Sequence, residues 1–265
     1  MSRYDAMFAR CAKAREGVFG AFLMLGDPDL ATSAILLDAA VEGGADMIEV
    51  GIPFSDPVAD GPVIQAAAER ALAAGVRTAD CFALISAFRA RHPHVPVGIL
   101  TYANLVLARG RERFAQDAAA AGADSLLIAD VPAFEAAPYA AAAREAGIDP
   151  VLIAASNTPP DTLRRIAELG AGYTYVVARA GVTGVTQTAQ QDQAPLLAAL
   201  GETGAAPAIL GFGISTPEHV KHALSCGAAG VISGSAIVRL IAEDPDPATA
   251  IQSFVATMKA ATRQS

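Results

Sequence analysis

The sequence predicts a (β/α)8 barrel, formed as one domain over residues 1–265 with an extra helix at its N-terminus. Eight short apolar runs, rich in Val, Ile and Leu and without strict alternation, are typical of parallel strands that are covered on both faces. An Ala-rich segment with helix start and stop signals follows each run. Eight such units take about 33 residues each, and barrels of this type typically have ~250 residues.

The strands are expected in this order: Phe19–Leu25, Met47–Gly51, Val97–Thr101, Ser125–Ala129, Pro150–Ala154, Tyr173–Val177, Ala208–Gly211 and Gly230–Ser233. A doubly wound open sheet is the structural alternative. Such a sheet usually has fewer strands and a glycine-rich turn after the first one. Here the first turn is Gly26-Asp27-Pro28, which lacks that pattern, so the barrel is favoured.

Helices are expected between the strands, with additional ones at Arg3–Lys13 and Thr78–Arg91. The run Ser215-Thr216-Pro217-Glu218 has the pattern of a capping box with Pro in the first turn. Glycines that favour positive φ are expected where helices end, at Gly43, Gly44, Gly122, Gly147, Gly170 and Gly227.

Composition excludes several function classes. Nineteen Lys and Arg against 27 Asp and Glu give a net charge of −8, which argues against nucleic acid or an anionic membrane as the main partner. The longest charge-free stretches are interrupted by Pro, Gly, Asn and Ser, so no transmembrane helix is expected. Residues 1–17 lack the apolar segment of a signal peptide, and the three cysteines form no metal or disulfide pattern; we expect a cytoplasmic protein.

Lysine and histidine are scarce, which narrows the chemistry further. The chain has three Lys and four His, and none of them follows the carboxyl end of a predicted strand. A Schiff-base aldolase and a His-ligated metal site are therefore not expected. Proton transfer by carboxylates on a phosphorylated substrate, without metal or cofactor, remains.

Two carboxylates are the candidate catalytic groups because active sites of this fold lie at the carboxyl ends of the strands. Glu49 lies within an apolar run, and Asp60 lies in the proline-rich loop that follows it. A structural ion pair is the alternative for Glu49, and a turn or helix-cap role is an equal alternative for Asp60. Asp27-Pro28 and Asp56-Pro57 are interpreted as turn formers.

Two glycine-containing turns, Gly211–Ser215 and Ser233–Ala236, follow the last two strands. Loops at these positions of the fold commonly bind phosphate with backbone N–H groups and a helix N-terminus. The alternative is that the glycines only permit the turns. The long loop Arg179–Gln193, after the sixth strand, is interpreted as a lid, with a plain insertion as the alternative.

The run Glu49–Pro62, EVGIPFSDPVADGP, resembles the signature of the tryptophan synthase alpha subunit family. The resemblance covers essentially the whole chain, including Leu25–Pro28, Tyr102–Leu105, Ala129–Pro132, Tyr173–Tyr175, Arg179–Gly184, Gly211–Ser215 and Ile232–Ala236. It implies a retro-aldol cleavage of indole-3-glycerol phosphate to indole and glyceraldehyde 3-phosphate. In this family's pattern, Glu49 matches the acid/base, and Asp60 matches the carboxylate that stabilises charge at the indole N–H.

The resemblance also implies the binding residues. The indole pocket maps onto Phe22, Leu100, Tyr102, Leu127, Ala129, Ile153, Tyr175, Phe212 and Ile232, which could equally be ordinary barrel core. Phosphate positions map onto Gly184, Gly213, Gly234 and Ser235, and Thr183 matches a lid residue that orients Asp60. Met24 and the run Ala154–Asn157 depart from the family pattern without involving Glu49 or Asp60.

The family further implies a partner, a pyridoxal-phosphate beta subunit in an α2β2 complex that receives the indole. No cofactor is expected in this chain itself. Pro53–Asp60 and Asn104–Ala108 are expected to face the partner. Three rivals stay open: a stand-alone lyase that releases free indole, a non-catalytic barrel that activates a partner, and a sugar-phosphate isomerase.

Overall fold

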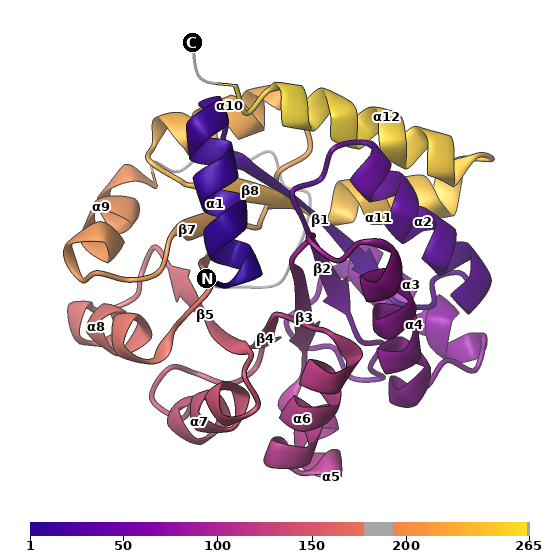
Figure 1. Ribbon diagram of the computed structural model, residues 1–265, viewed down its shortest axis with the longest axis horizontal. Helices are drawn as coiled ribbons and strands as arrows, with labels where there is room; N and C mark the ends of the chain where they lie inside the picture. Colours follow the sequence, from indigo (N-terminus) through magenta and orange to yellow (C-terminus); the bar gives the residue numbers. More distant parts are fainter. Residues whose placement is uncertain (178–192, 264–265) are drawn as a thin grey trace.

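The computed structural model describes residues 1–177 and 193–263, in which eight parallel strands pair in chain order and close into a barrel. The strands are β1 (Val18–Met24), β2 (Met47–Gly51), β3 (Val97–Thr101), β4 (Ser125–Ile128), β5 (Asp149–Ala155), β6 (Thr174–Val177), β7 (Ala208–Leu210) and β8 (Gly230–Ser233). Helices surround this ring on the outside (Figure 1). The predicted barrel is confirmed.

The described helices follow the strands along the chain. They are α1 (Arg3–Ala14), α2 (Leu30–Glu42), α3 (Pro62–Ala73), α4 (Thr78–Arg91), α5 (Ala103–Arg109), α6 (Arg111–Ala121), α7 (Ala137–Glu145), α8 (Pro160–Leu169), α9 (Ala194–Glu202), α10 (Pro217–Ser225), α11 (Ser235–Glu243) and α12 (Pro247–Ala260). The expected extra helices are α1, which extends one residue beyond Lys13, and α4, which has the predicted bounds.

Strand bounds agree with the prediction for β2, β3 and β8 and differ at the ends of the others. β1 begins and ends one residue earlier than expected, and β5 extends one residue further at each end. Ala129, Tyr173 and Gly211 lie just outside β4, β6 and β7. Apolar residues continue past the point where pairing ends, so hydrophobicity alone does not mark these ends.

Three local expectations are wrong. Gly170 ends α8 in an extended conformation with φ −80°, and the positive φ of that turn belongs to Gly172. Gly43 likewise has φ −69°, whereas Gly44 takes the left-handed conformation. The capping box expected at Ser215 is not formed: Thr216 caps α10 by accepting from the His219 N–H, with Pro217 in the first turn.

The barrel has an inner and an outer apolar cluster. The outer one packs strands against the surrounding helices. The inner one joins side chains from the strands to the buried face of α1, which contributes Tyr4, Met7 and Cys11. Since Tyr4 reaches Ser125, the first residue of β4, α1 covers the amino-terminal end of the barrel and leaves the carboxyl end for a site.

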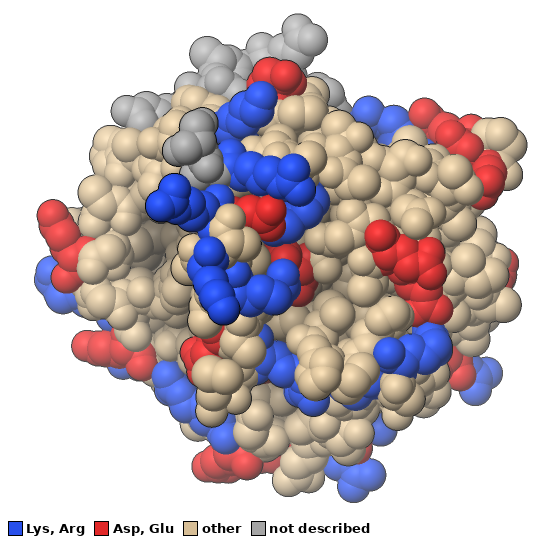
Figure 2. All heavy atoms as spheres, turned by 45° about the horizontal axis from the view of Figure 1, so that its top comes forward, with Lys and Arg blue, Asp and Glu red and all other residues tan. Residues whose placement is uncertain are grey.

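Charged side chains gather around α1 on the face shown in Figure 2. Buried Asp46 accepts from Arg10 at 2.9 Å and Lys259 at 2.8 Å, and Lys259 also pairs with Glu16. These contacts join α1, α12 and the start of β2, so they hold the amino-terminal cover of the barrel in place.

Within the described ranges, no single helix has the length and apolarity to cross a membrane. Among the same residues one helix pair, α3 and α4, meets those criteria together, and the two helices are bent by 101° relative to each other.

Candidate active site

Glu49 is the third residue of β2, inside the barrel. It lies in register with Phe22 of β1 on one side and Gly98 of β3 on the other. Its side chain is buried, and the Tyr173 hydroxyl donates a 2.6 Å hydrogen bond to Oε1. Among the described residues Oε2 has no hydrogen-bond partner and no cation faces the carboxyl, so the structural ion pair considered for Glu49 is not formed there.

Burial raises the pKa of Glu49 to about 7; the Tyr173 hydrogen bond opposes this shift and the nearby Asp60 carboxylate adds to it. A carboxyl with a pKa near neutrality exists in both protonation states at physiological pH. It is therefore suited to give a proton and to take one.

Asp60 lies in the loop between β2 and α3, where its amide donates to the Pro57 carbonyl at 3.0 Å. Its carboxyl is largely buried and hydrogen bonds to the Tyr102 side chain. The Tyr102 hydroxyl also accepts from the Ala59 N–H at 3.3 Å, and its ring stacks on Phe54 at 5.3 Å. Burial raises the pKa of Asp60 to about 6, against the effect of the Tyr102 hydrogen bond.

The side chains expected to line an indole pocket come together in one place. Phe22, Leu127, Tyr175 and Ile232 belong to the inner cluster, and Leu100, Ala129, Ile153 and Phe212 pack against it while keeping partial exposure. Tyr102, directly after β3, is buried and its ring stacks on Phe54. The four partly exposed residues come from β3, β5 and the segments after β4 and β7, so they mark the open end of the barrel.

The loops expected to bind phosphate are adjacent. Ser233 at the end of β8 donates to the Ile214 carbonyl at 2.6 Å, which ties the two loops together. Gly213 is exposed with φ +76°, and Gly234 precedes α11, of which Ser235 is the first residue. The N-terminus of α11 therefore presents free N–H groups beside the loop, an arrangement that favours an anion.

Gly211 has a different role. A Cβ there would lie 2.0 Å from the Tyr175 ring, so glycine is needed for Tyr175 to occupy the inner cluster. Thr183, Gly184 and the predicted lid Arg179–Gln193 lie outside the described residues, apart from Gln193 itself.

Asp27 was expected to form a turn, and this interpretation is incomplete. Its side chain is fully buried and forms a bidentate ion pair with Arg70 of α3. Arg70 Nε donates to Oδ1 and Nη2 donates to Oδ2, each at 2.7 Å. The pair connects the loop after β1 to the helix that follows Asp60. Asp56, by contrast, is exposed and accepts a hydrogen bond from Ser55, as suits a turn.

Tyr173 is the site residue that sequence reasoning missed. It was expected as the first residue of a strand and as part of a stretch that resembles the family, with no role in the site, whereas it lies just before β6 and contacts Glu49. The available signal was a tyrosine entering the barrel interior opposite a buried carboxylate, which needs a donor.

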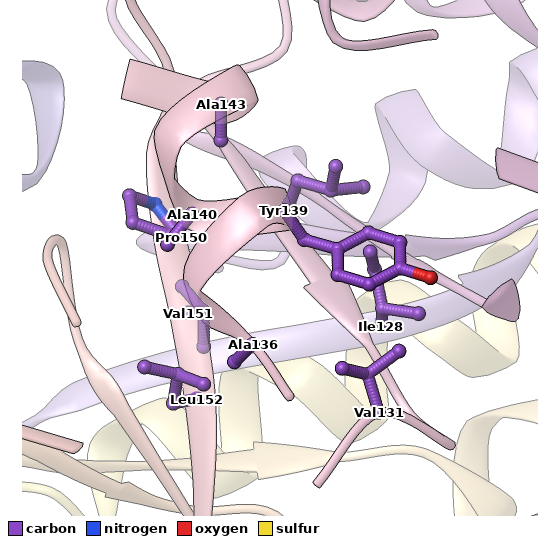
Figure 3. A pocket seen from close by; sticks show the side chains of 10 residues that line it. Ile128, Val131, Ala136, Tyr139, Ala140, Ala143, Pro150, Val151 and Leu152 are labelled. Carbon is purple, nitrogen blue, oxygen red and sulfur yellow. The ribbon is translucent and has the colours of Figure 1, made fainter. Parts of the chain in front are cut away.

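Two hollows lie near the fourth and fifth strands. One, of about 340 Å³, is lined by Ala129, Asp130, Ile153 and neighbouring residues at the open end of the barrel. The other, of about 20 Å³, lies between α7 and the outer side of β4 and β5 (Figure 3). Its lining has no charged side chain, so it offers no acid–base chemistry.

Within residues 1–177 and 193–263, no cluster of His, Cys, Asp and Glu is arranged to hold a metal ion. The candidate site has two buried carboxyls with raised pKa, apolar side chains at the open end of the barrel and the N-terminus of α11 beside the Gly213 loop. This combination defines an enzyme of the (β/α)8-barrel class.

Comparison with known proteins specifies the family. Residues 8–264 match the family model described as tryptophan synthase alpha chain, and the chain belongs to this family. It is 53% identical to the tryptophan synthase alpha chain of Shewanella amazonensis and 51% identical to that of Serratia proteamaculans, each over 99% of this chain and 100% of the relative.

Solved structures agree. Tryptophan synthase from Mycobacterium tuberculosis superimposes with a TM-score of 0.90 at 31% identity, over 100% of this chain and 99% of that one. The tryptophan synthase complex from Pyrococcus furiosus gives 0.81 at 36% identity, over 92% of this chain and 98% of that one.

Proposed function

We propose that this chain carries out its family's lyase reaction in tryptophan biosynthesis, the cleavage of indole-3-glycerol phosphate, with Glu49 as acid/base and Asp60 as electrostatic stabiliser. The observation that carries this proposal is the Glu49 carboxyl. One of its oxygens is held by Tyr173 and the other has no partner among the described residues, beside the apolar side chains of the inner cluster. Such an oxygen can act on a substrate without breaking an existing contact.

The reaction breaks one carbon–carbon bond. Protonated Glu49 delivers its proton to C3 of the indole ring, which turns the ring into a leaving group. The bond between C3 and the side chain then breaks and its electrons return to the ring, giving indole. The adjacent side-chain hydroxyl becomes the aldehyde of glyceraldehyde 3-phosphate and returns a proton to Glu49, so no net proton is consumed.

Asp60 acts on the ring nitrogen. Protonation at C3 places positive charge on the indole N–H, and an ionised carboxylate there lowers the energy of that state. In this geometry Tyr102 holds Asp60 through its hydroxyl while its ring stacks on Phe54.

The binding roles follow from the same layout. Phe22, Leu100, Tyr102, Leu127, Ala129, Ile153, Tyr175, Phe212 and Ile232 would enclose the indole, and Gly213, Gly234 and Ser235 would bind the phosphate, with Thr183 and Gly184 as expected lid contributions. The backbone N–H groups at the start of α11 supply the anion contact.

The partner is a tryptophan synthase beta subunit, in the α2β2 assembly that the family implies. The two segments expected to face it, the loop Pro53–Asp60 and residues Asn104–Ala108 of α5, carry large exposed apolar side chains, Val58 and Leu107. The acid–base groups for the lyase step, Glu49 and Asp60, belong to this chain. Pyridoxal phosphate would belong to the beta partner. We also infer that the chain works in the cytoplasm, as a single barrel domain.

The experiment is a product assay with the purified chain, alone and with the beta subunit. Equal amounts of indole and aldehyde should form, and Ser235→Ala should raise KM for the phosphate ester while kcat changes little. A sugar-phosphate isomerase would release no indole, and a non-catalytic activator would bind the beta subunit without turnover.

A further inference from the structure

Met24 is the last residue of β1, and its side chain points into the barrel. Along this strand Phe19, Ala21 and Leu23 belong to the outer apolar cluster, whereas Phe22 and Met24 belong to the inner one. Met24 is only 3% exposed, although it lies at the carboxyl end of its strand, where substrates of this fold bind. Its side chain is therefore part of the inner wall beside the candidate site.

Met24 shares one row of the barrel with two residues expected to contact the indole ring. It lies in register with Gly51 of β2, Gly51 lies in register with Leu100 of β3, and Leu100 lies in register with Leu127 of β4. These strands are neighbours in the closed ring (Figure 1). Leu127 is in the inner cluster and Leu100 packs against it, so the row faces the interior at one level.

Gly51 leaves the middle of this row without a side chain, and Met24 reaches over it. A Cβ on Gly51 would lie 3.0 Å from both Sδ and Cε of Met24 and 2.8 Å from Cζ of Phe22. The end of the thioether and the edge of the Phe22 ring thus meet where a side chain of β2 would otherwise lie. Contact between a methionine sulfur and the edge of an aromatic ring is favourable, so the two side chains close the wall on this side.

The wall lies beside the acid/base. Glu49 is in register with Phe22 and precedes Gly51 by two residues, so Glu49 and Gly51 lie on the same inner face of β2. An indole ring whose C3 reaches the Glu49 carboxyl therefore has Phe22 and Met24 on its β1 side.

We propose that Met24 is a specificity-determining residue for the lyase reaction: its thioether, placed over Gly51, bounds the space for the indole ring and excludes substituents on the adjacent edge of that ring. Met24 takes no part in proton transfer. This role rests on the proposed function, and it assigns the substrate class as indoles that are unsubstituted at one edge of the benzo ring.

The test uses the full chain and the reverse reaction, in which indole condenses with glyceraldehyde 3-phosphate. Indole is compared with indoles that carry one methyl group at each benzo position in turn. Met24→Ala removes the thioether, so the ratio of kcat/KM for methylindole to that for indole should rise at least about tenfold, because a methyl group that gains room in a pocket is worth about this factor. The rise should be confined to methyl groups on one edge of the ring.

Met7→Ala is the matched control. Met7 is also a methionine of the inner cluster and is 2% exposed, but it lies on α1 at the amino-terminal cover of the barrel. Both variants remove the same buried side chain, so a general loosening of the barrel would change both, whereas the expected change in ratio belongs to Met24→Ala alone. Met24→Val shortens the side chain, suits a strand and should give a smaller rise, which keeps the test usable if Met24→Ala does not fold.

Equal ratios in wild type and the Met24 variants would overturn the inference. So would a rise for methyl groups at every ring position, or an equal rise in Met7→Ala. Equilibrium dialysis of the same indoles gives the ratio of affinities without turnover. A wild-type chain that forms no product would therefore contradict the proposed lyase function separately, while the dialysis ratios still decide the role of Met24.

Discussion

The Tyr173 hydroxyl donates to one oxygen of the Glu49 carboxyl at 2.6 Å, deep inside the barrel. This single contact gives Glu49 two unequal oxygens. It also limits how far burial raises the Glu49 pKa, because a donor to the carboxylate stabilises the charged form. The balance leaves the group near neutrality, where a residue that both gives and takes a proton works best.

The acid side of the pH–rate profile should report Asp60. Its carboxyl must be charged to stabilise the ring nitrogen, and burial raises its pKa to about 6. We therefore expect kcat/KM to fall as the pH drops below about 6. Tyr102→Phe removes a donor to the charged form, so this limb should move to higher pH. A limb that does not move would show that another group controls it.

Stability should depend on pH through Glu49. Its pKa is about 7 when folded, against an ordinary value of 4.5, so the folded chain holds a proton that the unfolded chain has lost. The stability from this proton is fully present below the unfolded pKa and is lost as the pH rises through 7. The variant Glu49→Gln has no such proton to lose, so its stability does not fall in this pH range through residue 49. Relative to wild type, its free energy of unfolding should rise by roughly 2–3 kcal/mol between pH 5 and 8.5. Urea unfolding at the two pH values tests this; a constant difference would contradict it.

Arg70 is expected to be essential for stability near the site. Arg70→Ala leaves the fully buried Asp27 carboxylate without its partner, which should cost about 3–5 kcal/mol. The matched control is Arg113→Ala, which breaks the exposed pair with Asp117 and should cost less than about 1 kcal/mol. Equal losses of unfolding free energy in urea would show that the buried Asp27–Arg70 pair stabilises the chain no more than the exposed pair does.

The partner surface can be tested at Leu107, which is 51% exposed on α5. Leu107→Asp should weaken binding of the beta subunit at least about tenfold, because a charge would be buried in the interface. Lyase activity of the isolated chain should not change. Ile35→Asp, on the outer helix α2 and 58% exposed, is the control and should bind normally. Titration calorimetry compares the two; equal affinities would place the interface elsewhere.

Much of the fold was predictable because each strand is an apolar run ended by a turn signal, as Met47–Gly51 illustrates. The ends of strands such as β4 and β7 were not, since Ala129 and Gly211 look like strand residues and only hydrogen-bond pairing separates them. Gly170 shows the same limit: which of two nearby glycines takes a positive φ depends on the neighbouring turn.

Some residues of the candidate site could be predicted from the sequence and others could not. Glu49 and Asp60 stand out as acids in apolar or proline-rich surroundings, so residue type and position alone suggest them. Tyr173 and Asp27 matter through contacts with Glu49 and Arg70, which lie 124 and 43 positions away in sequence. Such pairings depend on the register of the closed barrel, which no local pattern contains.

The most direct measurement is the rate of indole release from indole-3-glycerol phosphate by Glu49→Gln, compared with wild type and with Glu112→Gln, an exposed glutamate on α6. Loss of the acid/base should lower kcat by at least about a hundredfold, while Glu112→Gln keeps the wild-type rate. A near-normal rate in a folded Glu49→Gln chain would contradict the assignment of Glu49.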